Sequence, residues 1–141
     1  MKSSKLVILT ATASMLAAIP MWAHHSFAAE YDRNKPIVFK DVVVTNYEWT
    51  NPHARFYVNV KDDPSCVSNC KMTNWNFELA SPNVLKRQGW TRNSMKEGDH
   101  VSVSGSAAKD GAKMGNAQSV VLADGKRMGA ASSIDDAKDG K

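Results

Sequence analysis

Three histidines are the residues of this sequence whose types and positions best suit metal chemistry: His24, His25 and His53. If export processing makes His24 the first residue, its α-amino group and its imidazole can chelate one ion together. His25 and His53, which follows a turn at Asn51-Pro52, can then add further nitrogen ligands. Imidazole and amine nitrogens suit copper and zinc, and affinity in the divalent series peaks at copper. Copper is therefore the candidate cofactor. The alternative is that the paired histidines are hydrated in a flexible arm and that His53 is a turn residue bonded to nearby backbone.

Other candidate ligands carry a weaker signal. His100 heads a predicted strand beside Asp99, and we expect it to be an exposed edge residue. Met114 and Met128 offer soft sulfur for Cu(I), but isolated methionines more often serve packing. The sequence contains no HxxH or HExxH motif that would add to the metal hypothesis.

A second candidate site is a shallow ligand-binding face on one predicted strand. Arg55, Tyr57 and Asn59 share the outward parity of that strand, because successive side chains of a strand point to opposite faces. Such a face would bind a glycan or a small organic molecule. Phe56 and Trp75 fall on the inward parity of their strands, so we expect them in the core.

The signal for an enzyme is thin, and catalysis stays a third hypothesis. Glu30 with Asp32, or Glu48 with Glu78, are candidate carboxylate pairs, but nothing in the sequence fixes their separation. Ser26 follows a histidine without a motif of the GxSxG kind. No glycine-rich phosphate loop is present.

The beginning of the chain has the pattern of a secretory signal peptide. Lys2 and Lys5 precede an apolar run over 6–19, and this run is shorter than the roughly 17–25 residues that span a bilayer. We predict a signal peptide over 1–23, export to the periplasm and no stable membrane insertion afterwards. Cleavage after Ala28 and an uncleaved anchor are the alternatives.

Charge and composition argue against nucleic-acid binding and favour a single domain. The chain of 141 residues has a net charge of +4. Loss of 1–23 removes two lysines and no acid, so the mature charge falls to +2. No run of basic residues remains to bind nucleic acid. With 43% hydrophobic residues the chain suits a single domain, predicted over 24–129, with a flexible tail over 130–141.

Cys66 and Cys70 are the two cysteines of the chain. In an oxidising compartment the expected state is a disulfide between them. The closed loop is so short that the bond would contribute only about 2 kcal/mol and hold a hairpin tip. A metal site would need further ligands, and the spacing differs from the CxxC of redox enzymes.

Hydrophobic alternation and turn residues predict a mainly β domain. The expected strands and the one short helix between strands three and four cover 36–49, 54–61, 73–79, 82–88 (the helix), 100–105 and 116–122. This order is that of a small five-stranded OB-like Greek-key barrel. An open β-sandwich with one helix is the alternative.

Six motifs carry a resemblance to a known family. They are HHSFAAEYD at 24–32, EWTNPHA at 48–54, NWNFELASPN at 74–83, GWTR at 89–92, GDHVSVSG at 98–105 and GNAQSVVLADG at 115–125. Together they resemble an uncharacterised family of small exported bacterial proteins, a domain of unknown function. The resemblance covers nearly all of the chain after the predicted signal peptide. It implies an exported, single-domain β protein and points to no particular activity.

The resemblance also singles out positions of this chain. Its signature residues are His24, His25, Ser26, Phe27, Glu48, Trp49, Asn51, Pro52, His53, Trp75, Ser81, Pro82, Asn83, Gly89 and Trp90. Two departures are Arg55, where the family more often has an aromatic residue, and the tip with Cys66 and Cys70, which looks like a local addition. The leading hypothesis is a periplasmic binding or accessory protein whose partner is a metal ion or a small ligand.

Overall fold

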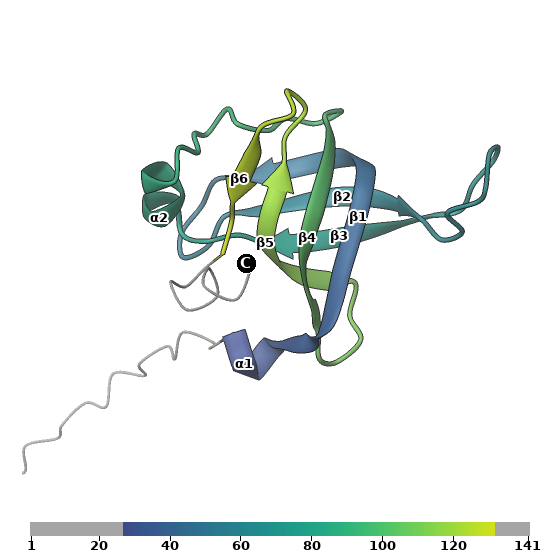
Figure 1. Ribbon diagram of the computed structural model, residues 1–141, viewed down its shortest axis with the longest axis horizontal. Helices are drawn as coiled ribbons and strands as arrows, with labels where there is room; N and C mark the ends of the chain where they lie inside the picture. The colour runs from purple at the N-terminus through teal and green to yellow at the C-terminus, as the bar shows by residue number, and fades with distance from the viewer. Residues whose placement is uncertain (1–26, 132–141) are drawn as a thin grey trace, which may run out of the picture.

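The computed structural model describes residues 27–131, which form a mainly β fold with two short helices. In chain order the elements are α1 (Phe27–Glu30), β1 (Tyr31–Glu48), β2 (Arg55–Lys61), β3 (Met72–Glu78), α2 (Pro82–Arg87), β4 (His100–Ala108), β5 (Met114–Val121) and β6 (Arg127–Gly129). Figure 1 shows the strands as one strongly curved layer, with α2 and α1 at its margins. The mainly β prediction is confirmed.

The six strands belong to one sheet in the order β3-β2-β1-β4-β5-β6. These neighbours are antiparallel, and a further parallel pairing of β3 with β5 closes a hydrogen-bond ring through five strands. The five ring strands correspond to the five predicted ones. The short β6, which pairs with β5, was not predicted because three residues show no periodicity.

The length of β1 explains how one strand serves two neighbours. Its first part pairs with β4 and its last part with β2, and register shifts interrupt both ladders. Asp41 has a φ of 52° within one of these shifts. Such bulges bend and twist a strand. The strand begins at Tyr31 instead of the predicted Pro36, since the four polar residues in between hide the pattern.

The side chains of β2 alternate between the core and the surface as predicted. Phe56 and Val58 of β2 are fully buried, while the outward residues of the same strand, Arg55, Tyr57 and Asn59, are half-exposed. Trp90 is buried, and its indole Nε1 donates to the Gly129 carbonyl at 2.6 Å. Trp75 is only partly buried and packs on the edge of the core beside Phe77. β6 therefore helps to hold the core although its sequence signal is weak.

The short helix α2 forms for local reasons. The Ser81 hydroxyl accepts from the Val84 backbone N–H at 3.4 Å, and Pro82 occupies the first turn. Gly89 then leaves the helix with a φ of 90°, in the left-handed region that favours glycine. Leu85 is fully buried. Docking of this side chain stabilises a helix too short to persist alone.

The ring closes where β3 and β5 meet, and a glycine makes this possible. Gly115 pairs with Phe77. A Cβ atom at Gly115 would lie 2.7 Å from Ile37 Cδ1 and 2.7 Å from Phe77 Cε1. The close approach of the two strands thus requires the missing side chain.

The β2–β3 hairpin projects from the sheet and carries the cysteines at its tip (Figure 1). The predicted disulfide between Cys66 and Cys70 is confirmed. A hydrogen bond from the Thr73 hydroxyl lowers the pKa of Asp62 beside the tip. The loop is therefore tied both by a covalent bond and by polar contacts across the hairpin.

Packing continues to the last residues that the structure describes. Ala130 and Ala131 are buried, and the backbone of Ala130 bonds to Gln118 and Ala80. The packed chain therefore includes both of these residues. The predicted signal peptide and the rest of the predicted tail lie outside the described residues. Neither helix between 27 and 131 is long and apolar enough to cross a membrane.

Candidate functional site

The end of β3 carries an unusual residue, a buried carboxylate. Glu78 is 5% exposed and is the one charged side chain that is buried among residues 27–131. A buried carboxylate is costly unless charged or hydrogen-bonding partners surround it. The neighbours of Glu78 therefore define the first place to search for a function.

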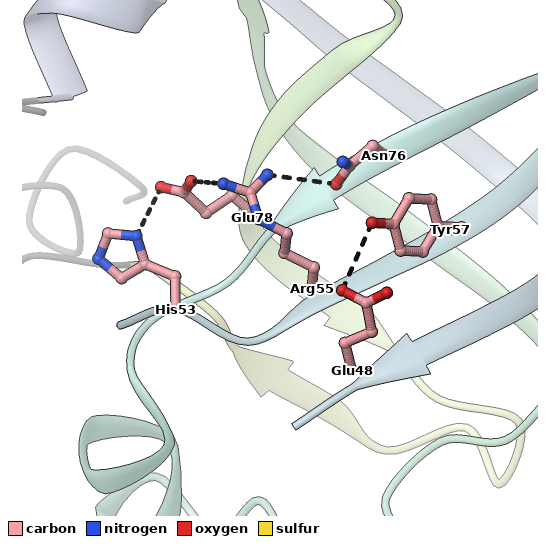
Figure 2. Close-up of polar contacts among 6 residues, drawn as sticks. All are labelled: Glu48, His53, Arg55, Tyr57, Asn76 and Glu78. Carbon is pink, nitrogen blue, oxygen red and sulfur yellow. Dashed lines mark hydrogen bonds and ion pairs between the residues drawn. The ribbon is translucent and has the colours of Figure 1, made fainter. Parts of the chain in front are cut away.

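The carboxylate of Glu78 contacts two side chains, His53 and Arg55 (Figure 2). Its Oε1 lies 3.1 Å from His53 Nδ1, and its Oε2 accepts from Arg55 Nη2 at 2.6 Å. A weaker contact of 3.5 Å joins Arg55 Nη1 to the Asn76 side-chain oxygen. We call His53, Arg55 and Glu78 the Glu78 cluster.

The strand register and the turn before β2 position this cluster. Arg55 stands directly opposite Glu78 in the β2–β3 ladder. Ahead of it, the Ala54 backbone exchanges hydrogen bonds with the residues that follow β3: Ala54 N donates to Ala80 O at 3.2 Å, and Leu79 N donates to Ala54 O at 2.9 Å. The turn bearing His53 is thus fixed against the end of β3.

The ion-pair contact with Glu78 is made by one ring nitrogen of His53, Nδ1, and no contact of Nε2 is found within 27–131. The side chain of His53 is 26% exposed, while that of Glu78 is 7% exposed. When Nδ1–H donates to a carboxylate, the lone pair of Nε2 is left to accept a proton or bind a metal. The geometry therefore presents His53 Nε2 as a ligand atom on an oriented ring.

A buried tyrosine connects this cluster to the beginning of the described chain. Tyr31 follows α1 directly and is 2% exposed, and its hydroxyl makes no hydrogen bond of standard geometry within 27–131. Burial first, and the negative charge of Glu78 second, raise the pKa of Tyr31. The hydroxyl thus stays neutral at any physiological pH beside the buried carboxylate.

The predicted ligand face on β2 exists as a row, but its side chains already have partners. Tyr57 donates to Glu48 Oε2 at 3.4 Å, and the Asn59 side-chain oxygen accepts from Asn74 at 2.9 Å. Arg55 belongs to the Glu78 cluster. The face is half-exposed, so a ligand there would meet a preformed polar network.

The remaining predicted ligands do not join His53. His100 bonds through Nδ1 to Asp41 at 2.9 Å on another part of the surface, and Met128 is buried in the core. His24 and His25 lie outside the described residues. Within 27–131 no group of three or more His, Cys, Asp or Glu side chains is arranged to hold a metal ion. A metal at His53 would therefore need ligands from beyond this range.

The sequence predicted no specific role for Glu78, which was a candidate only as one member of a carboxylate pair with Glu48. The two carboxylates flank the same arginine, since Arg55 pairs with Glu48 on one side and Glu78 on the other. The available signal was the hairpin register, which sets Arg55 opposite an acid. Tyr31 carried no signal, because its contact with the cluster depends on the path of β1.

Comparison with known proteins adds a family without a function. Residues 12–118 match the model of a family of unknown function, DUF6152. The chain belongs to this family. No curated protein and no solved structure matches. The DUF6152 match includes His24, His25 and the whole Glu78 cluster, and it ends within β5. The resemblance seen in the sequence is confirmed.

Proposed function

We propose that this DUF6152 protein is an exported, periplasmic binding protein that holds a copper-type ion at His53. The ligands are the ring of His53, the α-amine and ring of His24, and the ring of His25. The observation that carries the proposal is the 3.1 Å ion-pair contact between His53 Nδ1 and the buried carboxylate of Glu78.

The chemistry of that contact supports a metal ligand. Histidines that bind metals usually donate their other ring N–H to a carboxylate or carbonyl, which fixes the tautomer and makes the ligating nitrogen more basic. Glu78 provides such a carboxylate for His53. Arg55 holds the second carboxylate oxygen at 2.6 Å, so Glu78 is oriented on both sides and cannot easily turn away to ligate the ion itself.

The path of the chain supports the choice of His24 and His25. The first described residue, Phe27, lies in α1, and α1 runs straight into Tyr31 beside Glu78. The end of α1 is held in place because Lys109 N donates to Glu30 O at 2.9 Å. Two or three residues before Phe27 span at most about 10 Å, so both histidines start from the neighbourhood of the cluster.

We also propose that the five-strand ring is an OB-like Greek-key barrel. The helix α2 lies between β3 and β4, β1 pairs with both β2 and β4, and β3 pairs in parallel with β5. Small barrels of this type present ligands on one face and through their loops. The turn with His53 would then be a rim position.

The test compares two forms of the protein that differ at the amino terminus. One begins at His24 with a free α-amine, and the other has the same sequence with that amine acetylated. We expect the free terminus to bind Cu(II) at least about tenfold more tightly in a calorimetric titration, since acetylation removes the amine of His24 from the chelate. Equal affinity would contradict the proposed ligand set. Amino-terminal sequencing of periplasmic protein checks the cleavage site directly.

A second candidate function is binding of a glycan or a small organic molecule on β2. It is favoured by the outward row of Arg55, Tyr57 and Asn59, whose polar ends are already ordered by neighbours. A ligand there is expected to change tryptophan fluorescence in metal-free buffer, and Tyr57→Phe should weaken it. A flat response across a glycan library would count against this function.

A further inference from the structure

A groove lies at the opposite end of β2 from the Glu78 cluster. β1 pairs with β2 only from Val43 onward, where Val43 stands opposite Asn59. Val60 and Lys61 therefore have no partner in β1, which bends away at its bulge to pair with β4 alone. The space between the two diverging strands has a volume of about 870 Å³. This is within the range of small-molecule sites, roughly 300–1,000 Å³.

Exposed apolar side chains are concentrated at this groove. Among residues 27–131, three large hydrophobic side chains are exposed, and two of them, Val38 (61%) and Met72 (42%), line the groove. Phe39 and Val60 add partly buried apolar surface to its wall. Apolar side chains that gather at a concave surface mark a binding site more often than scattered ones do.

The charges around the groove favour an anion. Lys40 and Lys61 line it, and both are exposed. The one acidic residue in the lining, Asp41, bonds to His100, which also lines the groove. The carboxylate is thus directed to the imidazole. Lys61 Nζ donates to the Cys66 carbonyl at 3.0 Å, which uses one of its three N–H groups, so both lysines can still meet a negative headgroup.

We propose that this groove binds a small amphipathic anion, a free carboxylate with a linear apolar chain such as a medium-chain fatty acid. The chain would lie on Val38, Phe39 and Met72, and the carboxylate would meet Lys40 and Lys61. This site is separate from His53 and needs no metal ion. It therefore stands or fails independently of the proposed copper site.

The probe experiment uses the full mature protein in buffer with a metal chelator. Anilinonaphthalene sulfonate, an apolar anion that fluoresces in apolar surroundings, is bound first and then displaced by decanoate. We expect decanoate to displace the dye, whereas acetate lacks the apolar chain and decyltrimethylammonium carries the wrong charge. Displacement by decyltrimethylammonium as readily as by decanoate would overturn the charge argument.

A matched pair of valines provides the control variants. Val38→Glu puts an acid into the groove, while Val67→Glu makes the same change at the cysteine-bearing tip, where the side chain is 94% exposed. We expect the dissociation constant for decanoate to rise about tenfold or more in Val38→Glu and to stay within about twofold in Val67→Glu. Lys40→Gln should raise it several-fold.

Three results would overturn the proposal. Equal losses in the two glutamate variants would show that binding is not in the groove. Unchanged decanoate affinity in both glutamate variants would also show that decanoate binds elsewhere. Sedimentation of the wild-type protein as a dimer that excludes the dye, with Val38→Glu monomeric, would assign the groove to a second copy of this chain.

Discussion

Two histidine–carboxylate pairs of nearly equal length stand in different surroundings. His53 lies 3.1 Å from Glu78, and His100 lies 2.9 Å from Asp41. The side chains of the first pair are 26% and 7% exposed, and those of the second are 60% and 81% exposed. Only the first carboxylate also binds an arginine. Burial and a third partner, not the distance, thus distinguish an oriented ring from a surface contact.

The largest expected difference between the pairs concerns stability. Glu78→Gln leaves Arg55 facing a neutral amide in a largely dry place, and it should lower the free energy of unfolding by about 2–4 kcal/mol. Asp41→Asn breaks an exposed pair and should cost no more than about 0.5 kcal/mol. Urea denaturation of the two variants measures both values. Equal losses would mean that the Glu78 cluster is no more than another surface contact.

The second prediction concerns the strand closure that sets Glu78 in place. Gly115→Ala puts a methyl group against Ile37 and Phe77 at 2.7 Å, and overpacking of this kind costs about 1–3 kcal/mol. Gly129→Ala is the matched control, because its Cβ would meet only the end of Gln88 at 3.4 Å. Thermal unfolding should show a lower midpoint for the first variant. Two identical midpoints would contradict the tight approach of β3 and β5.

The third prediction compares two tyrosines. Tyr47 donates to the Thr91 carbonyl at 3.2 Å, so Tyr47→Phe should cost about 1 kcal/mol at pH 7. Tyr31→Phe removes a buried hydroxyl without a hydrogen bond of standard geometry and should be nearly neutral or stabilising. A cost equal to that of Tyr47→Phe would show that the Tyr31 hydroxyl is bonded to Glu78.

The fourth prediction concerns how the stability contributed by the same two tyrosines, Tyr31 and Tyr47, changes at alkaline pH. Burial raises the pKa of both tyrosines above the ordinary value of 10.0. Above pH 10 the unfolded chain therefore loses these protons while the folded chain keeps them, so stability must fall as pH rises. Either phenylalanine variant should show a shallower fall than the wild type in urea titrations between pH 9 and 11. An unchanged slope in both would contradict the burial of these phenols.

Much of the fold could be predicted because its causes are local. Alternation marks β2 and β3, and Ser81, Pro82 and Gly89 carry the helix signals whatever surrounds them. The start of β1 was missed because its first residues are held by β4 rather than by apolar alternation. The strand β6 was missed because its pairing with β5 depends on the closed fold.

The candidate site could be predicted less well. The sequence indicated His53 as a ligand from its type and turn position, but the partner that orients it comes from another strand. Glu78 is buried only because β3 sits between β2 and β5 in the ring. Tyr31 lies beside the cluster although it precedes Glu78 by 47 positions in the chain. Such contacts follow from topology, which residue spacing along a chain does not encode.

The most direct test of the copper proposal is a Cu(II) titration of mature His53→Gln beside mature His100→Gln. The two variants make the same substitution in the two histidine–carboxylate pairs, so they differ only in surroundings. We expect His53→Gln to weaken copper binding at least about tenfold and His100→Gln to leave it within about twofold of the wild type. Equal affinities in the two variants would contradict a metal ligand role for His53.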